Sequence, residues 1–348
     1  MRKSRAISNK TKVNKQTNNI NVIEYKKQEK EEKGKKEEET FSNEWEQLIN
    51  YKFNSKGELV HKKTLKKCPK LDFQEYELVG IYVQNYVENY LITKYNLTTL
   101  YVPNKNINPD FSKRDDTQAQ CKILTTKDFP TNPKCLIIIQ GSGSVRLGQW
   151  SRSVCINENL QIGAMGPYIE NAIKNKFSVI ILNPNERNDF IYEKNKIEEF
   201  KTMEDHCLYV YYNIIRKNEN IKEIYIVAHS MGGGCAIEIL LINFEDLLNG
   251  KIKKIAFIDS VHGDDYKDLG DVGLKKFRAI SRNFIRSTKP AGTFLGSYEK
   301  AKKGVNFYSS GHNEHEYTSG YAVSEVFKFL CSGEVKNKSK SAVKWKVK

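Results

Sequence analysis

The stretch IYIVAHSMGGG, Ile224 to Gly234, decides how the fold is interpreted. It begins as a run of β-branched, aromatic and other apolar residues, which is typical of a buried strand. The run ends in a histidine, a serine and three glycines, and the helix-like pattern CAIEILLI follows. The stretch therefore predicts a strand, a sharp turn at the serine and a helix.

A serine in such a turn has a well-defined chemical use. In the nucleophile elbow of α/β-hydrolases, G-x-S-x-G, the serine lies on a sharp turn from a strand to a helix, and small residues let the two backbones approach. Here the pattern reads Ala228-His229-Ser230-Met231-Gly232. Alanine in the first position adds only a methyl group, which the turn can accept. The pattern predicts the elbow geometry; chemistry at Ser230 is a separate inference, because small residues also serve strand-helix packing alone.

Four further short apolar runs surround this stretch, at residues 135–140, 178–183, 255–260 and 305–310. Helical patterns separate them, and a last one, YAVSEVFKFL, follows the final run. Apolar strands buried on both faces and separated by helices indicate a mostly parallel sheet with helices on both faces. The sequence therefore predicts an α/β protein with an α/β-hydrolase-like fold.

The chain before residue 135 is expected to add peripheral elements. The letters NSKG predict a turn between two short strands, and residues 104–120 a loop insertion. Between them, Phe73 to Tyr95 have the pattern of an amphipathic helix. We expect four residues at helical spacing to face the core: Leu78, Tyr82, Tyr86 and Tyr90.

Length and composition fit one large domain with extensions or two small domains, because the chain has 348 residues with 39% hydrophobic content. Residues 1–40 are polar and close with the mixed-charge run KKQEKEEKGKKEEE, which has no apolar stripe with which to dock. We predict a disordered tail at 1–40, an α/β-hydrolase-like domain at 41–332 and a basic tail at 333–348.

The net charge of +15 is concentrated at the two ends of the chain. Residues 1–20 contribute +6 and residues 334–348 contribute +5, so +11 lies in the tails and +4 is spread over the rest. A basic fold surface for nucleic acid is therefore not indicated. Basic tails can contact RNA phosphates without sequence preference, act as nuclear-import signals or simply remain solvated.

Cysteine usage and hydropathy indicate a soluble intracellular protein. The seven cysteines are an odd number without a C-x-x-C pair, which favours neither disulfides nor a zinc site. No apolar run approaches the roughly 18 residues of a membrane span, and the first residues lack the apolar core of a secretory signal. We expect no metal, no cofactor and no membrane association.

A nucleophilic serine needs a base within reach and an acid that orients the base. In hydrolase chain order the acid and then the histidine follow the serine. Asp259 ends the strand pattern after the elbow helix, so it should reach the same sheet edge as Ser230. Three histidines follow: His262 is too close to Asp259, whereas His312 and His315 both come after the last strand pattern, and spacing does not choose between them.

An oxyanion hole needs two preorganised N–H donors. The amide of Met231, directly after the serine, would supply one, and the loop QGSGS would supply the other from Ser142 or Gly143. The glycines of this loop equally suit a structural turn.

Several blocks of the sequence together carry a family resemblance: IIIQGSGSVRLGQWSRSVCINENLQIGAMGPYIENAI, VIILNPNE, EDHCLYVYY, VAHSMGG, IDSVH and HEYTS. The chain, from YKFNSKGELVHKKT to about residue 332, resembles the Argonaute-binding protein two domain family. This α/β-hydrolase-like family includes animal cotranscriptional regulators of the FAM-one-seven-two type. The block GSGSVRLGQW followed by NPN is much more specific than the elbow.

The resemblance implies a role beside Argonaute proteins, in small-RNA silencing, heterochromatin or splicing. Matched by motif, it places the family's serine on Ser230, its DSVH aspartate on Asp259 and its HE-x-T-S histidine on His315 rather than His312. The sequence departs from the family at Gln140, where animal members tend to carry a histidine before the glycine loop.

Arg146, Gln149 and Trp150 lie in the most distinctive block. Beside an oxyanion loop, the arginine and glutamine could hold an anionic substrate or partner. Alternatively the three residues clamp the long loop to the sheet, which we favour because an ordered loop must satisfy its backbone polar groups.

Two functional hypotheses follow. The first is a nuclear interaction protein, in the nucleus alone or also in the cytoplasm, whose hydrolase-like domain serves an Argonaute or chromatin complex, with tails for import and loose RNA contact. The alternative is an active serine hydrolase that uses Ser230, His315 and Asp259 on an ester, thioester or acyl-peptide.

Overall fold

The computed structural model describes residues 49–106, 109–192, 194–297 and 304–333. The predicted tails at 1–40 and 333–348 lie outside these residues, apart from residue 333. Contacts divide the chain into two units, of which the second is Tyr51–Lys348. The fold below is that of the second unit.

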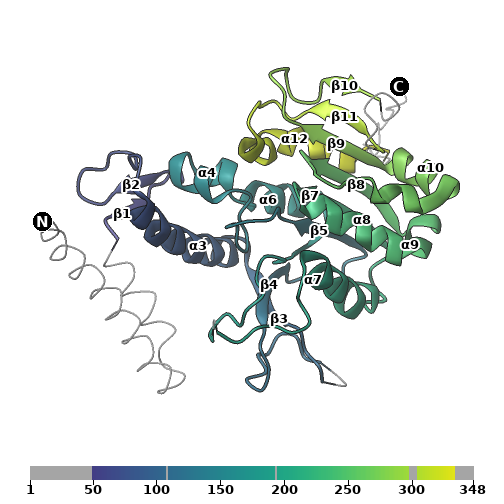
Figure 1. Cartoon of the computed structure of the whole chain (residues 1–348), viewed down its shortest axis with the longest axis horizontal. Helices are drawn as coiled ribbons and strands as arrows, with labels where there is room; N and C mark the ends of the chain where they lie inside the picture. The colour runs from purple at the N-terminus through teal and green to yellow at the C-terminus, as the bar shows by residue number, and fades with distance from the viewer. Residues whose placement is uncertain (1–48, 107–108, 193, 298–303, 334–348) are drawn as a thin grey trace, which may run out of the picture. The chain divides into compact units, whose positions relative to one another are not determined.

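A nine-stranded sheet forms the centre of this unit, in the order β10-β11-β9-β8-β7-β5-β6-β4-β3 (Figure 1). The strands from β6 to β11 in this order pair in parallel, whereas β3, β4 and β10 pair antiparallel at the edges. The bounds are β3 Leu97–Val102, β4 Cys121–Thr126, β5 Lys134–Ile139, β6 Ser178–Ile181, β7 Glu223–His229, β8 Ile252–Ile258, β9 Ser281–Ile285, β10 Phe294–Gly296 and β11 Asn306–Ser309. The predicted mostly parallel α/β-hydrolase-like sheet is confirmed.

Helices connect the strands and cover both faces of the sheet (Figure 1). Their bounds are α3 Phe73–Tyr95, α4 Arg152–Asn157, α5 Leu160–Gly163, α6 Gly166–Lys174, α7 Met203–Val210, α8 Gly232–Ile242, α9 Phe244–Leu248, α10 Gly270–Ile280 and α12 Thr318–Leu330. The described residues also form helical turns of other types. These are the π-helical turn η1 Tyr211–Arg216 after α7, and the 3-10 turns η2 Asp265–Leu269 and η3 His315–Tyr317. A separate hairpin, β1 Tyr51–Phe53 and β2 Leu59–His61, contains the predicted NSKG turn.

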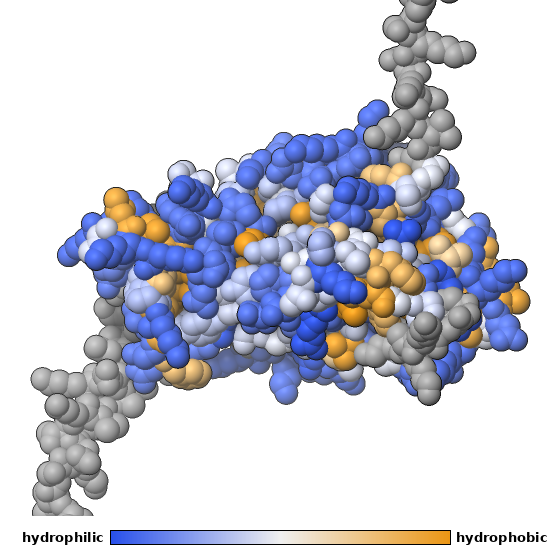
Figure 2. All heavy atoms as spheres, turned by 90° about the horizontal axis from the view of Figure 1, so that it is seen from above, coloured by the Kyte–Doolittle hydropathy of each residue, from blue (hydrophilic) through white to orange (hydrophobic). Residues whose placement is uncertain are grey.

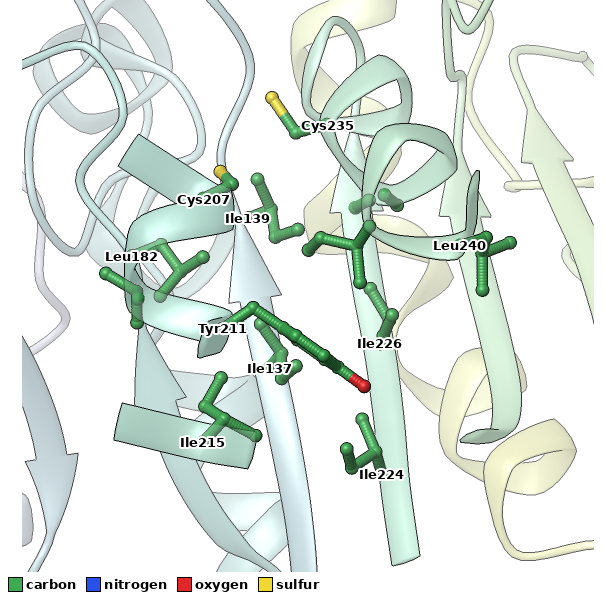
Figure 3. Close-up of a cluster of buried hydrophobic side chains, with 14 of the residues drawn as sticks. Ile137, Ile139, Leu182, Cys207, Tyr211, Ile215, Ile224, Ile226, Cys235 and Leu240 are labelled. Carbon is green, nitrogen blue, oxygen red and sulfur yellow. The ribbon is translucent and has the colours of Figure 1, made fainter. Parts of the chain in front are cut away.

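One hydrophobic core cluster lies between the sheet and the helices α7 and α8 (Figure 3), and Phe277 of α10 belongs to the same cluster. Alternate residues of the central strands, among them Ile137, Ile224 and Ile226, point to this side and are fully buried. Tyr211 crosses the core and donates its hydroxyl to Asp246 Oδ2 at 2.8 Å, which satisfies the polar end of a buried ring. Outside, the face seen in Figure 2 is mostly hydrophilic, with apolar residues in small separate areas.

Helix α3 has the predicted bounds, but the predicted core-facing residues are only partly right. Tyr82 is buried, whereas Leu78 is exposed. The ring of Tyr86 lies 4.5 Å from that of Phe53 in the hairpin. On its own helix, the ring of Tyr86 stacks with that of Tyr90. The buried stripe instead consists of small and branched residues next to the tyrosines: Val79, Gly80, Val83, Val87 and Leu91.

Among the described residues, the strands β3, β4, β9 and β10 escaped the sequence prediction. Residues 281–285, SRNFI, were expected within a helical region but form β9, where polar Arg282 and Asn283 interrupt the apolar pattern. The antiparallel pair β3 and β4 flanks the loop insertion predicted at 104–120, which the structure confirms as non-regular where it is described. The local pattern of such strands is weak because packing against their sheet neighbours, rather than intrinsic preference, stabilises them.

Candidate functional site

Ser230 lies at the carboxyl end of the central strand β7, in the turn that opens α8. Its φ of +52° is in the left-handed region, which costs a non-glycine residue on the order of 1–3 kcal/mol. Neighbouring backbone holds the turn: the Ser230 amide donates to Ile258 O at 3.1 Å, and its carbonyl accepts from Val261 N at 3.0 Å. This is the predicted strand, turn and helix.

The glycines after the serine are required by close packing. A Cβ on Gly232 would lie 2.5 Å from Gln140 O, and one on Gly233 would lie 1.7 Å from Ser260 Oγ. The elbow helix therefore starts in direct contact with the ends of β5 and β8.

Asp259 and His315 meet at the same edge of the sheet. The parallel strands β8 and β11 end there, and His315 Nδ1 lies 2.6 Å from Asp259 Oδ2. The His315 side chain is 32% exposed and that of Asp259 10%, so the ring is reachable from solvent and the carboxylate is not. The carbonyl of His315 accepts from Thr318 Oγ1 at 2.7 Å, which fixes the backbone of the histidine.

Asp259 is held as a carboxylate by its partners. Burial alone would raise its pKa, but the hydrogen bonds from His315 and from the Arg286 amide, together with their charges, bring the pKa below its usual range. Arg286 also approaches with its guanidinium, Nε 3.4 Å from Oδ2. Sequence reasoning missed Arg286, which lies on the loop after the unpredicted strand β9.

The other two downstream histidines lie elsewhere. His312 stacks on Tyr317 at 4.5 Å and its Nδ1 accepts from Glu314 N, whereas His262 Nδ1 lies 2.8 Å from Ser260 Oγ. Of the three, His315 is the one that contacts Asp259.

No hydrogen bond joins the Ser230 hydroxyl to His315 among the residues that the structure describes. In free hydrolases this bond is often long and tightens when substrate binds. The arrangement thus contains a strained serine and an oriented histidine-carboxylate pair at one sheet edge, which are the parts of a serine nucleophile system.

His229 packs against His315. The two rings stack with centroids 4.7 Å apart and an angle of 27° between their planes. Burial first, and then the charge of His315, lower the pKa of His229 to about 3, so His229 is neutral near pH 7. The elbow pattern did not assign a role to this residue.

The glycine loop after β5 lies directly beside the serine. A Cβ on Gly141 would be 2.8 Å from Ser230 Cβ, whereas one on Gly143, which has φ +100°, would meet nothing within 4 Å. Ser142 and Gly143 are exposed at the tip of the loop, and Met231 is the residue before the first turn of α8, where N–H groups lack intrahelical partners. The proposed donors Met231, Ser142 and Gly143 thus border the elbow, and Gly141 is the loop residue packed on it.

Arg146, Gln149 and Trp150 are engaged with the loop itself. Arg146 Nη1 donates to Gly143 O and Val145 O, each at 3.2 Å. Gln149 Oε1 accepts from the Arg146 amide at 3.2 Å. Trp150 is 1% exposed, with its ring edge-on to Tyr168. These contacts are those expected of a clamp.

Asn185 of the NPN block contributes to the same clamp. Its Nδ2 donates to Gly141 O at 2.7 Å and to Val145 O at 3.0 Å, which ties the loop after β6 to the loop after β5. This explains why the two blocks occur together, although their positions in the sequence are 40 residues apart.

The described residues contain no group of three or more His, Cys, Asp or Glu side chains placed to hold a metal ion. None of the helices in that part of the chain is long and apolar enough to cross a membrane.

The sheet order and the elbow define an α/β-hydrolase-like domain, and sequence comparison assigns it to a family. The Arb2 domain matches residues 49–193 and 186–291. The chain belongs to the Arb2 domain family, which confirms the resemblance found in its sequence blocks.

The relatives share most of their length with this chain. It is 33% identical over 320 residues to "Cotranscriptional regulator ARB2A homolog" of Dictyostelium discoideum, covering 81% of this chain and 78% of the relative. It is 28% identical over 343 residues to the human "Cotranscriptional regulator ARB2A", covering 81% and 79%.

Solved structures with a similar chain course include "A histone deacetylase from Saccharomyces cerevisiae", with TM-score 0.44, 10% identity and coverage of 73% of this chain and 97% of that chain. The carboxylesterase CesB from Bacillus subtilis has TM-score 0.39, 11% identity and coverage of 73% and 99%.

Proposed function

We propose that this protein is a nuclear cotranscriptional regulator whose hydrolase-like domain assembles with chromatin or Argonaute complexes. The observation that carries the proposal is the similarity over 81% of the chain to a protein named as a cotranscriptional regulator. The charge distribution supports it, since +11 of the +15 lies in the end segments, as expected of import signals and of loose RNA contact. Argonaute, small-RNA silencing, heterochromatin and splicing are the finer parts of this proposal.

Affinity purification from the native cell, followed by mass spectrometry, tests the assembly. Wild type and Ser230→Ala should recover the same Argonaute or chromatin proteins, because the substitution removes one hydroxyl and little surface. Absence of Argonaute, chromatin and splicing proteins from the wild-type sample would reject the regulatory proposal. Their loss from Ser230→Ala alone would mean that assembly depends on chemistry.

A second candidate function is acyl hydrolysis at Ser230, on an ester, thioester or acyl-peptide. The specific observation in its favour is the 2.6 Å contact between His315 Nδ1 and Asp259, beside a serine with φ +52°. In this reaction His315 would take the Ser230 proton through Nε2 while the oxygen attacks the acyl carbon, and would then return the proton to the leaving group. Amides of Met231 and of the glycine loop would stabilise the oxyanion.

A fluorophosphonate probe tests this chemistry directly. Wild type should be labelled covalently and Ser230→Ala should not. A folded wild type that is not labelled under several buffer and pH conditions would reject acyl hydrolysis and leave the regulatory proposal standing.

A further inference from the structure

His229 is a buried polar residue whose ring forms no hydrogen bond. It is 4% exposed, and within the described residues neither ring nitrogen has a partner. An unpaired buried polar group costs about 1–3 kcal/mol. Its contacts with other rings, above all with that of His315, are the feature to explain.

The ring of His229 contacts two other rings. One face stacks on His315 at 4.7 Å, and Trp150 approaches at 6.0 Å with an angle of 74° between the planes. These are the stacked and edge-to-face arrangements that rings prefer. The backbone of Gly141 packs close to the ring, since a Cβ there would lie 3.3 Å from His229 Nδ1. A flat ring suits this narrow space.

Trp150 connects this contact to the start of α12, which follows the 3-10 turn that contains His315. Its ring lies 5.0 Å from that of Tyr168, and Tyr168 donates its hydroxyl to Ser319 O at 2.8 Å. Ser319 is in the first turn of α12, next to the Thr318 hydroxyl that holds the His315 carbonyl. The distinctive loop block therefore supports both the ring and the backbone of His315.

His315 needs such a second support. Its hydrogen bond to Asp259 restrains one ring nitrogen, but small coupled rotations about the two side-chain torsions can still tilt the ring plane. A flat surface against the ring face removes this freedom. A neutral neighbour also adds no like charge when His315 is protonated, and burial keeps His229 neutral.

We propose that His229 is a positioning residue for His315: its ring, backed by Trp150, holds the imidazole of His315 in the plane in which Nε2 faces Ser230. The inference rests on the proposed acyl chemistry for its purpose, but the positioning itself can be measured without any reaction.

The test compares His229→Leu, which is apolar and not flat, with His229→Phe, which restores a flat ring. Ile226→Ala, in the same strand and equally buried, is the control for lost stability without a lost ring. Thermal midpoints establish that each variant is folded. Selective ¹⁵N labelling of the six histidines then reports the His315 ring signals and the proton shared with Asp259. Fluorophosphonate labelling rates are measured on the same samples.

His229→Leu should broaden or shift the His315 signals and reduce the labelling rate about 10- to 100-fold, the order of effect of misplacing a reacting group. His229→Phe should restore both at least in part, and Ile226→Ala should lower the thermal midpoint with the His315 signals intact. Unchanged His315 signals in His229→Leu would overturn the proposal, as would equal changes in Ile226→Ala. If His229→Phe does not fold, the comparison of His229→Leu with Ile226→Ala still decides. If wild type is not labelled, acyl hydrolysis fails while the ring signals continue to test the positioning.

Discussion

Ser230 and Asp259 both adopt backbone conformations that L residues rarely take, with φ of +52° and +37°. Such strain persists only where surrounding structure fixes it, and it is concentrated at functional sites. Here two hydrogen bonds from the β8 side hold the turn at Ser230, and His315 and Arg286 hold Asp259. At the scale of residues, the molecule therefore maintains a costly arrangement around three side chains.

The contact between His315 and Asp259 predicts which histidine matters for reactivity. His315→Ala should reduce fluorophosphonate labelling about 10²- to 10⁴-fold, the usual contribution of a general base. His312→Ala should change it little, because its ring packs on Tyr317 instead. Equal losses from the two substitutions, measured as labelling rates on folded proteins, would contradict the assignment.

Two buried histidines predict a loss of stability in acid. Burial lowers the pKa of both His206 and His229 to about 3, well below the value near 6.5 expected in the unfolded chain. Between these pH values the unfolded chain binds more protons than the folded one, so the free energy of unfolding falls as pH drops from 6.5 toward 3. Asp259, whose folded pKa is lowered, adds a further loss below about pH 4.

His206→Gln tests this, because Gln does not titrate and can keep the hydrogen bond that His206 Nε2 accepts from Asn183 N. Urea unfolding at several pH values should give a shallower pH dependence for the variant, by up to about 1.4 kcal/mol per pH unit. An unchanged slope would show that His206 is not buried as a neutral ring.

At the scale of elements, the start of α8 packs closely against the ends of β5 and β8. The first three residues of this helix are glycines, but they are not equivalent. A Cβ on Gly233 would overlap Ser260 Oγ at 1.7 Å, whereas one on Gly234 would meet only Glu204 Oε1 at 3.7 Å. The strand-turn-helix pattern predicted small residues at all three positions. Packing against the segment after β8 decides that Gly233 must be glycine, whereas Gly234 has space for a methyl group.

Gly233→Ala should therefore destabilise the protein by about 1–3 kcal/mol or more, the range for overpacking in a core. Gly234→Ala should stabilise it by about 0.5–1 kcal/mol, because alanine is the better helix former and has space here. Denaturant unfolding of the two variants, matched in chemistry and adjacent in sequence, measures the difference. Similar effects of the two would mean that the helix start is not packed on Ser260.

At the scale of the whole molecule, basic residues that are scattered along the middle of the sequence come together on the folded surface. The middle of the chain carries only +4, and a basic fold surface was not expected. In the structure, Arg216, Lys222, Lys251 and Lys253 nevertheless line one hollow together with Glu219. Arg216 is partly neutralised there by Asp246, 3.7 Å away. The tails remain the larger concentration of charge.

Deletion of residues 1–20 and 334–348 should leave the thermal midpoint nearly unchanged, because the predicted tails contribute no apolar surface to the core. It should reduce nuclear accumulation and weaken salt-sensitive RNA binding, because it removes +11 of charge. Binding of a labelled single-stranded RNA across a salt series measures this. Undiminished affinity would assign RNA contact to the folded domain, and charge reversal of Lys222, Lys251 and Lys253 would then locate it.

The sequence alone determined the alternation of strands and helices, the elbow at Ser230 and the family, because apolar periodicity and short blocks are local properties of a chain. It also placed Asp259 at the right sheet edge, since parallel strands end together. Strand β9 was not visible, because polar Arg282 and Asn283 break its pattern and its neighbours in the sheet stabilise it.

Tertiary structure alone decided how the site is assembled. Spacing left His312 and His315 equivalent and the family resemblance favoured His315, but the contact itself depends on the loop conformation after β11, which brings His315 to Asp259. The packing of Gly141 on Ser230 and the stack of His229 on His315 join segments that are far apart in sequence. Such contacts depend on the distances and angles between packed elements, which no local pattern contains.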